Sequence, residues 1–368
     1  MSLMLEDTLV LEEIVVEGYE KVIKIKDDKA GLLAIICIHD TTLGPTLGGT
    51  RIYPYASFDD ALVDVLRLAK GMTYKAAIAE CGLGGGKSVI IIDPAKGKTE
   101  EMLRAFGKVV ESLQGLYTCA EDVGCNMDDV EVISRSTKYV TGLQHEKSSG
   151  NPSYFTAWGV YRGMQAALKK AYGSESVKDK IVAIQGAGSV GSILAGLLFW
   201  NGAKLIITDL AQEKAEKLAK QYGGSYCSPE EIWKVECDVF SPCALGGILN
   251  SHTIPQLQCK VVAGAANNQL LTEDDGDQLM KKGIIYAPDY VINAGGLINV
   301  AEEVTVEGYS PEQSRRKIEK LFDQLTTIFD LAEKNRCSSN QAANSLVEYR
   351  LKHKIGKRVD SLCHHHAQ

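Results

Sequence analysis

The fold is decided by residues 180–209, KIVAIQGAGSVGSILAGLLFWNGAKLIITD. An apolar strand pattern opens this stretch, a glycine-rich turn leads into an apolar helix pattern from about Ser189, and a second strand pattern ends at Asp209. A strand, a helix and a second strand at this spacing predict a βαβ unit of a parallel sheet.

The glycine-rich turn has the spacing G-x-G-x-x-G, with Gly186, Gly188 and Gly191 as its glycines. In this context Gly186 permits a tight turn, Gly188 lets the backbone approach a pyrophosphate, and Gly191 lets the helix lie close to the sheet. The helix starts with Ser189 and Val190, where unpaired N–H groups favour a phosphate. We therefore expect a dinucleotide site; the alternative is an α/β domain with a tight glycine turn and no nucleotide.

Asp209 indicates which dinucleotide binds. It ends the second strand pattern, eighteen residues after Gly191. A carboxylate at this point accepts hydrogen bonds from the ribose hydroxyls of NAD and repels the 2′-phosphate of NADP. The sequence therefore predicts NAD as the cofactor.

The alternation of strands and helices continues on both sides of this stretch. Downstream, the strand patterns CDVFSP, KVVAGAA and IIYAPD extend it into a doubly wound parallel sheet, and the chain is helical after Gly308. The small, polar segment EKSSGNPS, residues 146–153, is a linker. Strands are expected at 31–38, 87–93 and 116–122, and helices at 59–72, after the capping residue Thr99, at 153–172 and at 212–221.

The composition excludes several classes of function. The 368 residues are 45% hydrophobic and 24% charged with a formal net charge of −7, so no nucleic-acid-binding surface is expected. No apolar stretch suits a membrane span, and the acidic start MSLMLEDTLVLEE is unlike a signal peptide, so we expect a cytoplasmic protein. The ten cysteines are expected to be reduced, and no spacing of histidines indicates a metal site.

A second glycine cluster, GLGGGKS at residues 82–88, is one residue shorter than a P-loop and precedes a strand pattern, so a kinase or NTPase is not expected. A desolvated lysine at the position of Lys87 can serve as a general base. With Lys75 and Asp122 it would suit an α-amino acid beside a nicotinamide. The alternative is that both lysines are surface residues and Asp122 caps a helix.

Eight motifs occur in order along the chain: LGPTLGGTR (43–51), RLAKGMTYKAA (67–77), GGGKSVII (84–91), AEDVG (120–124), SSGNPS (148–153), SPCALGG (241–247), GAANNQL (264–270) and PDYVINAGGLINVAEE (288–303). Together they resemble the amino-acid dehydrogenase family that acts on glutamate, leucine, valine and phenylalanine, with the leucine and phenylalanine branch most similar. Tyr154 and Phe155, after SSGNPS, depart from the family pattern.

The resemblance implies an N-terminal α/β substrate domain, residues 1–145, and a Rossmann NAD domain, residues 146–331. It implies that C-terminal helices, residues 332–368, return to the first domain and that substrate binds between the domains. The implied reaction is reversible oxidative deamination of an L-amino acid to its 2-oxo acid and ammonia. The family also implies a homo-oligomer, a dimer or an octamer.

Residue roles follow from the same resemblance. Lys75 would hold the substrate carboxylate, Lys87 would activate water, and Asp122 would exchange protons with the amine. The implied cofactor contacts outside the glycine turn are Thr156, Ala244 and Asn267. Asn268 would lie near the substrate, and Gly44 and Gly85 would supply backbone contacts that line the cleft.

Four residues of the implied side-chain pocket bear on specificity. Leu43 and Val300 stand where glutamate members place a lysine and a serine, so glutamate would bury its γ-carboxylate without a partner. Ala120 resembles the leucine-type choice, whereas Leu297 resembles the phenylalanine-type choice. We expect a branched-chain substrate, with an aromatic one, phenylalanine or tryptophan, as the alternative. An inactive dinucleotide-binding homologue and a hydroxy-acid oxidoreductase are the remaining alternatives.

Overall fold

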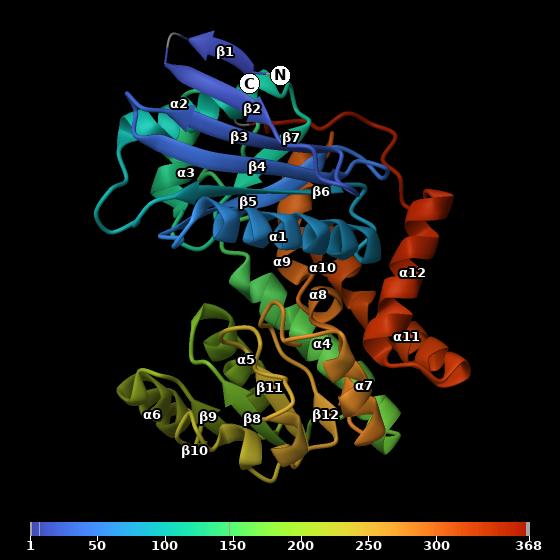
Figure 1. Cartoon of the computed structure of the whole chain (residues 1–368). Helices are drawn as coiled ribbons and strands as arrows, with labels where there is room; N and C mark the ends of the chain where they lie inside the picture. Colours follow the sequence, from blue (N-terminus) through green and yellow to red (C-terminus); the bar gives the residue numbers. More distant parts are fainter. Residues whose placement is uncertain (1, 7, 147, 366–368) are drawn as a thin grey trace. The chain divides into compact units, whose positions relative to one another are not determined.

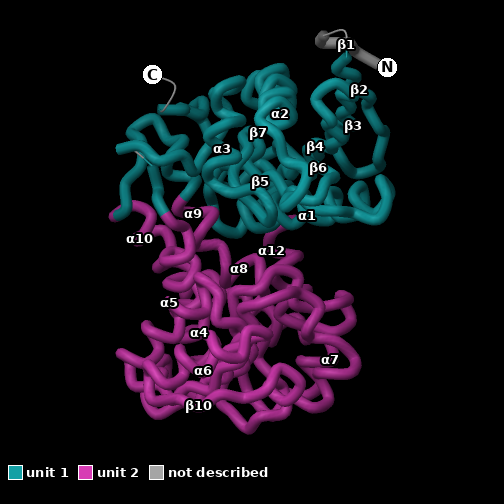
Figure 2. Tube along the Cα trace, turned by 90° about the vertical axis from the view of Figure 1, so that its left-hand side faces the viewer, with its two compact units in different colours: residues 1–150, 300–311, 350–368 teal, residues 151–299, 312–349 magenta. Residues whose placement is uncertain are grey.

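In a computed structural model of the chain, residues 2–6, 8–146 and 148–365 are described. The chain divides into two compact units, which Figure 2 shows in separate colours. Unit 1 comprises residues 1–150, 300–311 and 350–368, and unit 2 comprises residues 151–299 and 312–349.

These units divide the C-terminal part of the chain at other points than the expected domains 1–145, 146–331 and 332–368. Helix α11 (Leu321–Asn335) packs against helix α4 (Ser153–Tyr172), which keeps it in unit 2. The chain returns to unit 1 at Arg350, whose guanidinium donates to the carbonyl oxygens of Ala77 and Ile78 at 3.0 and 2.7 Å. The arginine therefore satisfies the free carbonyls at a helix end and fixes the returning segment there.

Unit 1 is built on a mixed sheet with the strand order β1-β2-β3-β4-β6-β5-β7. Its neighbours are antiparallel as far as β6, whereas β5 runs parallel to both β6 and β7. Because β5 inserts between β6 and β7, residues distant in sequence share one sheet face. The strands are β1 (Ser2–Glu6), β2 (Leu9–Glu13), β3 (Lys21–Asp27), β4 (Leu32–Asp40), β5 (Thr46–Tyr53), β6 (Gly84–Ile91) and β7 (Tyr117–Ala120).

Helices cover both faces of this sheet (Figure 1). Helix α1 (Phe58–Ile78) packs on β4 and β6, with Cys37, Val65 and Val89 among the buried side chains between them. Ser57 caps this helix, which continues past its expected end at Met72. Helices α2 (Glu100–Ser112) and α3 (Met127–Ser134) lie over the opposite face, and Thr99 caps α2 as expected.

Unit 2 contains a parallel sheet in the order β10-β9-β8-β11-β12-β13. This arrangement confirms the doubly wound sheet that the sequence predicts. The order reverses between β8 and β11, and ligands of such sheets bind at the carboxyl ends of the strands at this point. The strands are β8 (Ile181–Gln185), β9 (Lys204–Thr208), β10 (Ser225–Tyr226), β11 (Val239–Pro242), β12 (Val261–Val262) and β13 (Ile285–Tyr286).

The remaining helices belong to unit 2, and three of them, α9, α10 and α12, contain the residues at which the chain passes from one unit to the other. A buried cluster that includes Ile232, Phe240, Val262 and Leu279 fills one side of the parallel sheet. Among the described residues, no helix has the length and apolar character needed to cross a membrane. The helices are α5 (Ser189–Trp200), α6 (Gln212–Gln221), α7 (Asp274–Lys281), α8 (Asp289–Ile292), α9 (Gly295–Ala301), α10 (Pro311–Glu319) and α12 (Ser339–His353), with 3-10 turns η1 (Ile232–Lys234), η2 (Ile254–Gln256) and η3 (Glu302–Val304).

Candidate active site

The glycine turn of unit 2 joins β8 to α5 as the sequence predicts. Gly186 has a φ of 110°, and a Cβ at Gly191 would lie 2.0 Å from the Gly186 carbonyl oxygen, so both positions require glycine. A Cβ at Gly188 would meet nothing within 4 Å. Gly188 therefore borders open space at the start of α5, where Ser189 and Val190 form the first turn. This arrangement fits a bound phosphate.

Asp209 follows β9 and holds the glycine turn against the sheet edge. Its Oδ2 accepts a hydrogen bond from the Ala187 N–H at 2.7 Å, and its Oδ1 accepts one from the Ala211 N–H at 2.9 Å. The two bonds fix the plane of the carboxylate. Since each carboxylate oxygen can accept more than one hydrogen bond, acceptor capacity remains for a ribose.

Two other candidate cofactor residues of unit 2 lie close to the same sheet. Ala244 follows β11, and its Cβ would be 3.0 Å from a Cβ at Gly186. The amide nitrogen of Asn293 donates to Oδ1 of Asn267 at 2.7 Å, so Asn267 is held by its neighbour. The next residue, Asn268, has a positive φ of 51°.

Thr156 lies in the first turn of α4, beside the start of α9. Its hydroxyl donates to the Pro152 carbonyl oxygen at 3.0 Å. A Cβ at Gly296 would lie 2.6 Å from Oγ1 of Thr156, and one at Gly295 would lie 2.1 Å from the Phe155 carbonyl oxygen. The two glycines of the NAGG motif therefore allow α9 to approach α4 closely.

In unit 1, the residues expected to carry the chemistry gather on one sheet face. The ammonium of Lys87, on β6, is hydrogen-bonded to Oδ2 of Asp122, just beyond β7. Arg51, on β5 between these two strands, donates through Nε to Oδ1 of Asp122 at 3.2 Å. The lysine is only 4% exposed. Lys87 is therefore a buried, paired ammonium rather than a surface lysine.

The two cations control the charge of Asp122. Burial alone would raise the pKa of this carboxyl, but the ammonium of Lys87 and the guanidinium of Arg51 outweigh it and lower the pKa to about 2. A hydrogen bond from the Val123 N–H, 2.7 Å from Oδ1, acts in the same direction. Asp122 is consequently an anion at neutral pH, as proton exchange with a bound ammonium group requires.

Lys75 occupies the last turn of α1. The helix predicted from the sequence ended at Met72, three residues before it. Lys75 is half-buried, and it comes from the helix that covers β6. The neighbouring Gly85 of β6 is fixed by this packing, because a Cβ there would lie 2.1 Å from the Thr73 backbone nitrogen. Lys75 and Lys87 thus belong to elements in direct contact within unit 1.

The candidate pocket residues are divided between several elements. Ala120 is buried on β7, and the alternation of the strand places it on the face that Lys87 occupies. Leu297 is buried near the start of α9 and belongs to unit 2, whereas the half-buried Val300 belongs to unit 1. Leu43 precedes β5, and its carbonyl oxygen accepts a hydrogen bond from the Arg358 N–H at 2.9 Å.

Strand register points to two residues that the sequence reading left without a role. On β5, Leu47 pairs with Thr118 of β7 and Gly85 of β6, and so lies on the same face as Ala120 and Lys87. Gly44, in contrast, packs on the loop at Gly82, whose carbonyl oxygen would be 2.3 Å from a Cβ. The sequence analysis predicted no strand over residues 46–53, so the register of β5 that places Leu47 could not be used. Arg51, on the same strand, was missed for the same reason.

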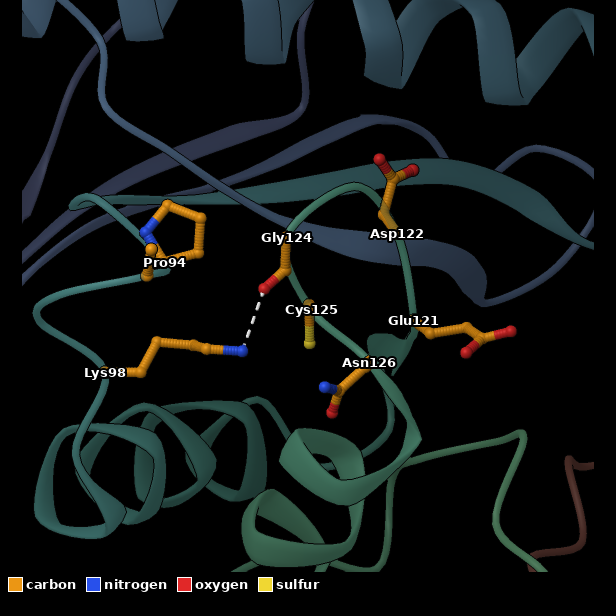
Figure 3. A pocket seen from close by; sticks show the side chains of 8 residues that line it. Pro94, Lys98, Glu121, Asp122, Gly124, Cys125 and Asn126 are labelled. Atoms are coloured by element: carbon orange, nitrogen blue, oxygen red, sulfur yellow. Dashed lines mark hydrogen bonds between the residues drawn. The ribbon is translucent and has the colours of Figure 1, made fainter. Parts of the chain in front are cut away.

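A pocket of about 520 Å³ lies behind the loop that carries Asp122 (Figure 3). In this view the Asp122 carboxylate is directed away from Lys98 and Cys125. Lys98 donates to the Gly124 carbonyl oxygen at 3.2 Å and to Asp129 at 2.6 Å, which fixes the loop. The pocket is lined by Pro94, Ala95, Lys98, Glu121, Asp122, Gly124, Cys125 and Asn126.

No group of three or more histidine, cysteine, aspartate or glutamate side chains suited to a metal ion occurs among the described residues. The run of histidines near the C-terminus includes His366, which lies outside them. His364 instead packs on the ring of Tyr139, with a centroid distance of 5.2 Å, and its Nε2 is 3.2 Å from the Thr118 hydroxyl.

Two family models match most of the chain. Residues 19–139 match the "Glu/Leu/Phe/Val dehydrogenase, dimerisation domain", and residues 207–354 match "Glutamate/Leucine/Phenylalanine/Valine dehydrogenase". The first match contains Lys75, Lys87 and Asp122, and the second contains strands β10 to β13 of the parallel sheet but begins after β8 and the glycine turn.

Individual relatives agree with the family models. The chain is 51% identical to a leucine dehydrogenase of Thermoactinomyces intermedius over 90% of this chain and 91% of that protein. It is 44% identical to a phenylalanine dehydrogenase of Bacillus thermotolerans over 96% of this chain and 93% of that protein. The crystal structure of L-tryptophan dehydrogenase from Nostoc punctiforme superposes with a TM-score of 0.80 and 45% identity, covering 92% of this chain and 96% of that one.

Proposed function

The chain belongs to the Glu/Leu/Phe/Val dehydrogenase family and is an amino-acid dehydrogenase, and we propose that it catalyses the reversible, NAD-dependent oxidative deamination of a branched-chain L-amino acid. The observation that carries the proposal is the buried cluster of Lys87, Asp122 and Arg51 on the sheet face of unit 1. Such a cluster has no structural use that an apolar core would not serve equally well.

The residues of unit 1 divide the proposed reaction among them. Lys75 holds the substrate carboxylate, which leaves the α-amino group to interact with the anionic Asp122. Bound NAD supplies the hydride acceptor. Loss of the Cα hydride to that acceptor, and of one proton from the amino group, would leave an imine. Lys87 passes its own proton through Asp122 to solvent, and the free amine then takes a proton from the water that attacks the imine carbon. Asp122 exchanges protons with the departing ammonia, so each proton moves between neighbouring groups of the cluster.

Unit 2 supports the cofactor assignment through two features. The start of α5 offers N–H groups beside the open space at Gly188, which suits a pyrophosphate. Asp209 has acceptor capacity for ribose hydroxyls and a negative charge that opposes a 2′-phosphate. Thr156, Ala244 and Asn267 are proposed to contact the nicotinamide end. NAD is therefore proposed over NADP.

The apolar side chains favour a hydrocarbon substrate. Ala120, Leu297 and Val300 offer no partner for a γ-carboxylate, so glutamate would lose its hydration without compensation. We place Leu47 in this pocket beside Leu43, because Leu47 lies on the face of the sheet that holds Lys87. The aromatic alternative is supported by the relatives that act on tryptophan and phenylalanine.

Assembly and location are further parts of the proposal. The family description of residues 19–139 as a dimerisation domain supports a homo-oligomer, which we propose to be a dimer or an octamer. The ten cysteines of the chain are free thiols, which supports the proposed location in the cytoplasm. Asn268 and the backbone at Gly44 and Gly85 complete the proposed substrate contacts.

Steady-state formation of NADH at mildly alkaline pH tests the proposal. The protein is assayed with NAD or NADP and a panel of leucine, valine, phenylalanine, tryptophan, glutamate and 2-hydroxy acids. We expect the highest kcat/KM with a branched-chain amino acid and NAD. Turnover of hydroxy acids alone would identify a different oxidoreductase, and nucleotide binding without any turnover would identify an inactive homologue.

A further inference from the structure

Arg51 has no role in the reaction outlined above, yet its side chain is hydrogen-bonded and ion-paired to the Asp122 carboxylate, as that of Lys87 is. Its Nε donates to Oδ1 of Asp122 at 3.2 Å, while Lys87 binds Oδ2. The two oxygens of the carboxylate are therefore held by two different cations from two adjacent strands. A carboxylate held at both oxygens cannot rotate to follow only one partner.

Arg51 is itself anchored on its far side. Its Nη1 donates to Oδ2 of Asp64, on α1, at 2.9 Å, and the hydroxyl of Tyr55 donates to the same oxygen at 2.5 Å. Burial, followed by the hydrogen bond to Asp64, raises the pKa of the Tyr55 phenol, so the tyrosine remains a proton donor. The guanidinium spans two carboxylates, which its planar fork of donors allows and a single ammonium does not.

The backbone makes room for this contact. A Cβ at Gly49, two residues before Arg51 on the same face of β5, would lie 2.8 Å from Cβ of Asp122 and 3.2 Å from its Oδ2. Any side chain at Gly49 would therefore push the carboxylate away from the strand. The glycine and the arginine together fit Asp122 against β5.

We propose that Arg51 is a positioning residue of the deamination reaction, which holds Asp122 in place through a guanidinium bridge to Asp64 and balances its charge so that Lys87 can release its proton. This inference rests on the proposed function. It assigns to Arg51 no contact with the substrate. Its action is electrostatic and geometric, through Asp122.

The charge balance has a definite sign. Asp122 holds the Lys87 proton by attraction, whereas the cation of Arg51 offsets that attraction and repels a protonated Lys87. Without Arg51, the attraction between Asp122 and Lys87 is no longer offset. Three further titratable groups interact with Asp122, namely Glu121, Cys125 and Tyr117, and burial raises the pKa of all three, which keeps the thiol and the phenol uncharged. Lys87 and Arg51 are the two cations whose charges lower the pKa of Asp122.

The test compares R51Q and R51K with the wild type in the leucine-dependent assay from pH 6 to pH 11. We expect R51Q to lower kcat by roughly 100-fold, as loss of positioning does, with little change in the KM for leucine. The pH at which kcat/KM rises should be higher in R51Q than in the wild type by about one unit. R51K should restore the pH profile, because lysine returns the positive charge. It should restore only part of kcat, because an ammonium lacks the planar set of donors with which the guanidinium spans Asp122 and Asp64.

Milder variants keep the test usable if R51Q folds poorly. D64N removes the outer anchor and Y55F only its hydrogen bond, so we expect successively smaller losses of kcat. R135Q is the matched control, since Arg135 makes an exposed ion pair with Glu100 at 2.9 Å in the same unit, and its kinetics should equal those of the wild type.

The possible outcomes separate the proposed role of Arg51 from the proposed function of the protein. A raised KM with unchanged kcat in R51Q would show that Arg51 binds substrate, and an unchanged pH profile would show that it has no electrostatic role; either overturns the inference. Wild-type protein that turns over no amino acid would overturn the proposed function itself. Active wild type with fully active R51Q and D64N would overturn the role of Arg51 alone.

Discussion

The two units build their sites in opposite ways. In unit 2, one continuous stretch of thirty residues supplies two strands, a turn and a helix, and the proposed ligand-binding groups are backbone N–H groups at the helix start. In unit 1, the groups are charged side chains from β5, β6 and the loop after β7, brought together by sheet register. A backbone site can be recognised from a local pattern, whereas a side-chain site depends on long-range pairing.

The largest effect is expected where the side-chain site is broken at its buried cation. Lys87→Ala should lower kcat by about 1,000-fold or more, because general-base catalysis typically contributes 100- to 10,000-fold. Calorimetric affinity for NAD should survive, because the dinucleotide turn belongs to unit 2. Lys24→Ala is the control, since Lys24 pairs with Glu12 at 3.2 Å on an exposed part of the same sheet. Comparable rates in K87A and wild type would remove Lys87 from the mechanism.

This contrast also explains what the sequence could predict. Residues 180–209 contain every signal for β8, α5 and β9, and the observed helix begins at the expected Ser189. The pairing of Lys87 with Asp122 could not be derived, because the residues are separated by 35 positions and meet only through β5. Their roles came from the family resemblance instead.

The C-terminal segment illustrates a different limit. Its helices were expected from their apolar periodicity, but the unit against which each one packs depends on tertiary contacts that periodicity does not specify. Helix α11 packs against α4, and the return to unit 1 begins only where Arg350 reaches the end of α1. Strand β5 shows the same limit, because the close packing of Gly49 against Asp122 and of Gly48 against β6 is visible only in three dimensions.

Substitutions in the glycine turn of unit 2 should act through steric clashes rather than through charge. Gly191→Ala places a Cβ about 2.0 Å from the Gly186 carbonyl oxygen, so the helix must move from the sheet. We expect the KM for NAD to rise roughly 10- to 100-fold, about 1.4–2.7 kcal/mol, together with a lower Tm. Gly188→Ala is the matched variant: its Cβ meets no protein atom within 4 Å, so NAD affinity should fall with an unchanged Tm. Equal Tm losses in both variants would contradict this reading of the turn.

A charge change in unit 2 sharpens the comparison. Asp209→Asn keeps an acceptor oxygen for only one of the two N–H groups, of Ala187 and Ala211, and removes the negative charge. The ratio of kcat/KM for NAD to that for NADP should fall by about tenfold, since repulsion of the 2′-phosphate is lost. The measurement is a pair of saturation curves for each protein with the same amino acid. A constant ratio would place the ribose away from Asp209.

The smallest effect is expected from removing one methyl group in unit 1. Ala120→Gly enlarges the proposed pocket beside Leu47, so the ratio of kcat/KM for phenylalanine to that for leucine should rise, by up to about tenfold. Ala34→Gly is the matched control, because Ala34 is fully buried in β4 on the opposite face of the same sheet. Both variants should lose some stability, since glycine weakens a strand interior, but only A120G should change the substrate ratio. A shift of the ratio in both variants would trace specificity to the rigidity of the sheet, and a shift in neither would remove position 120 from the pocket.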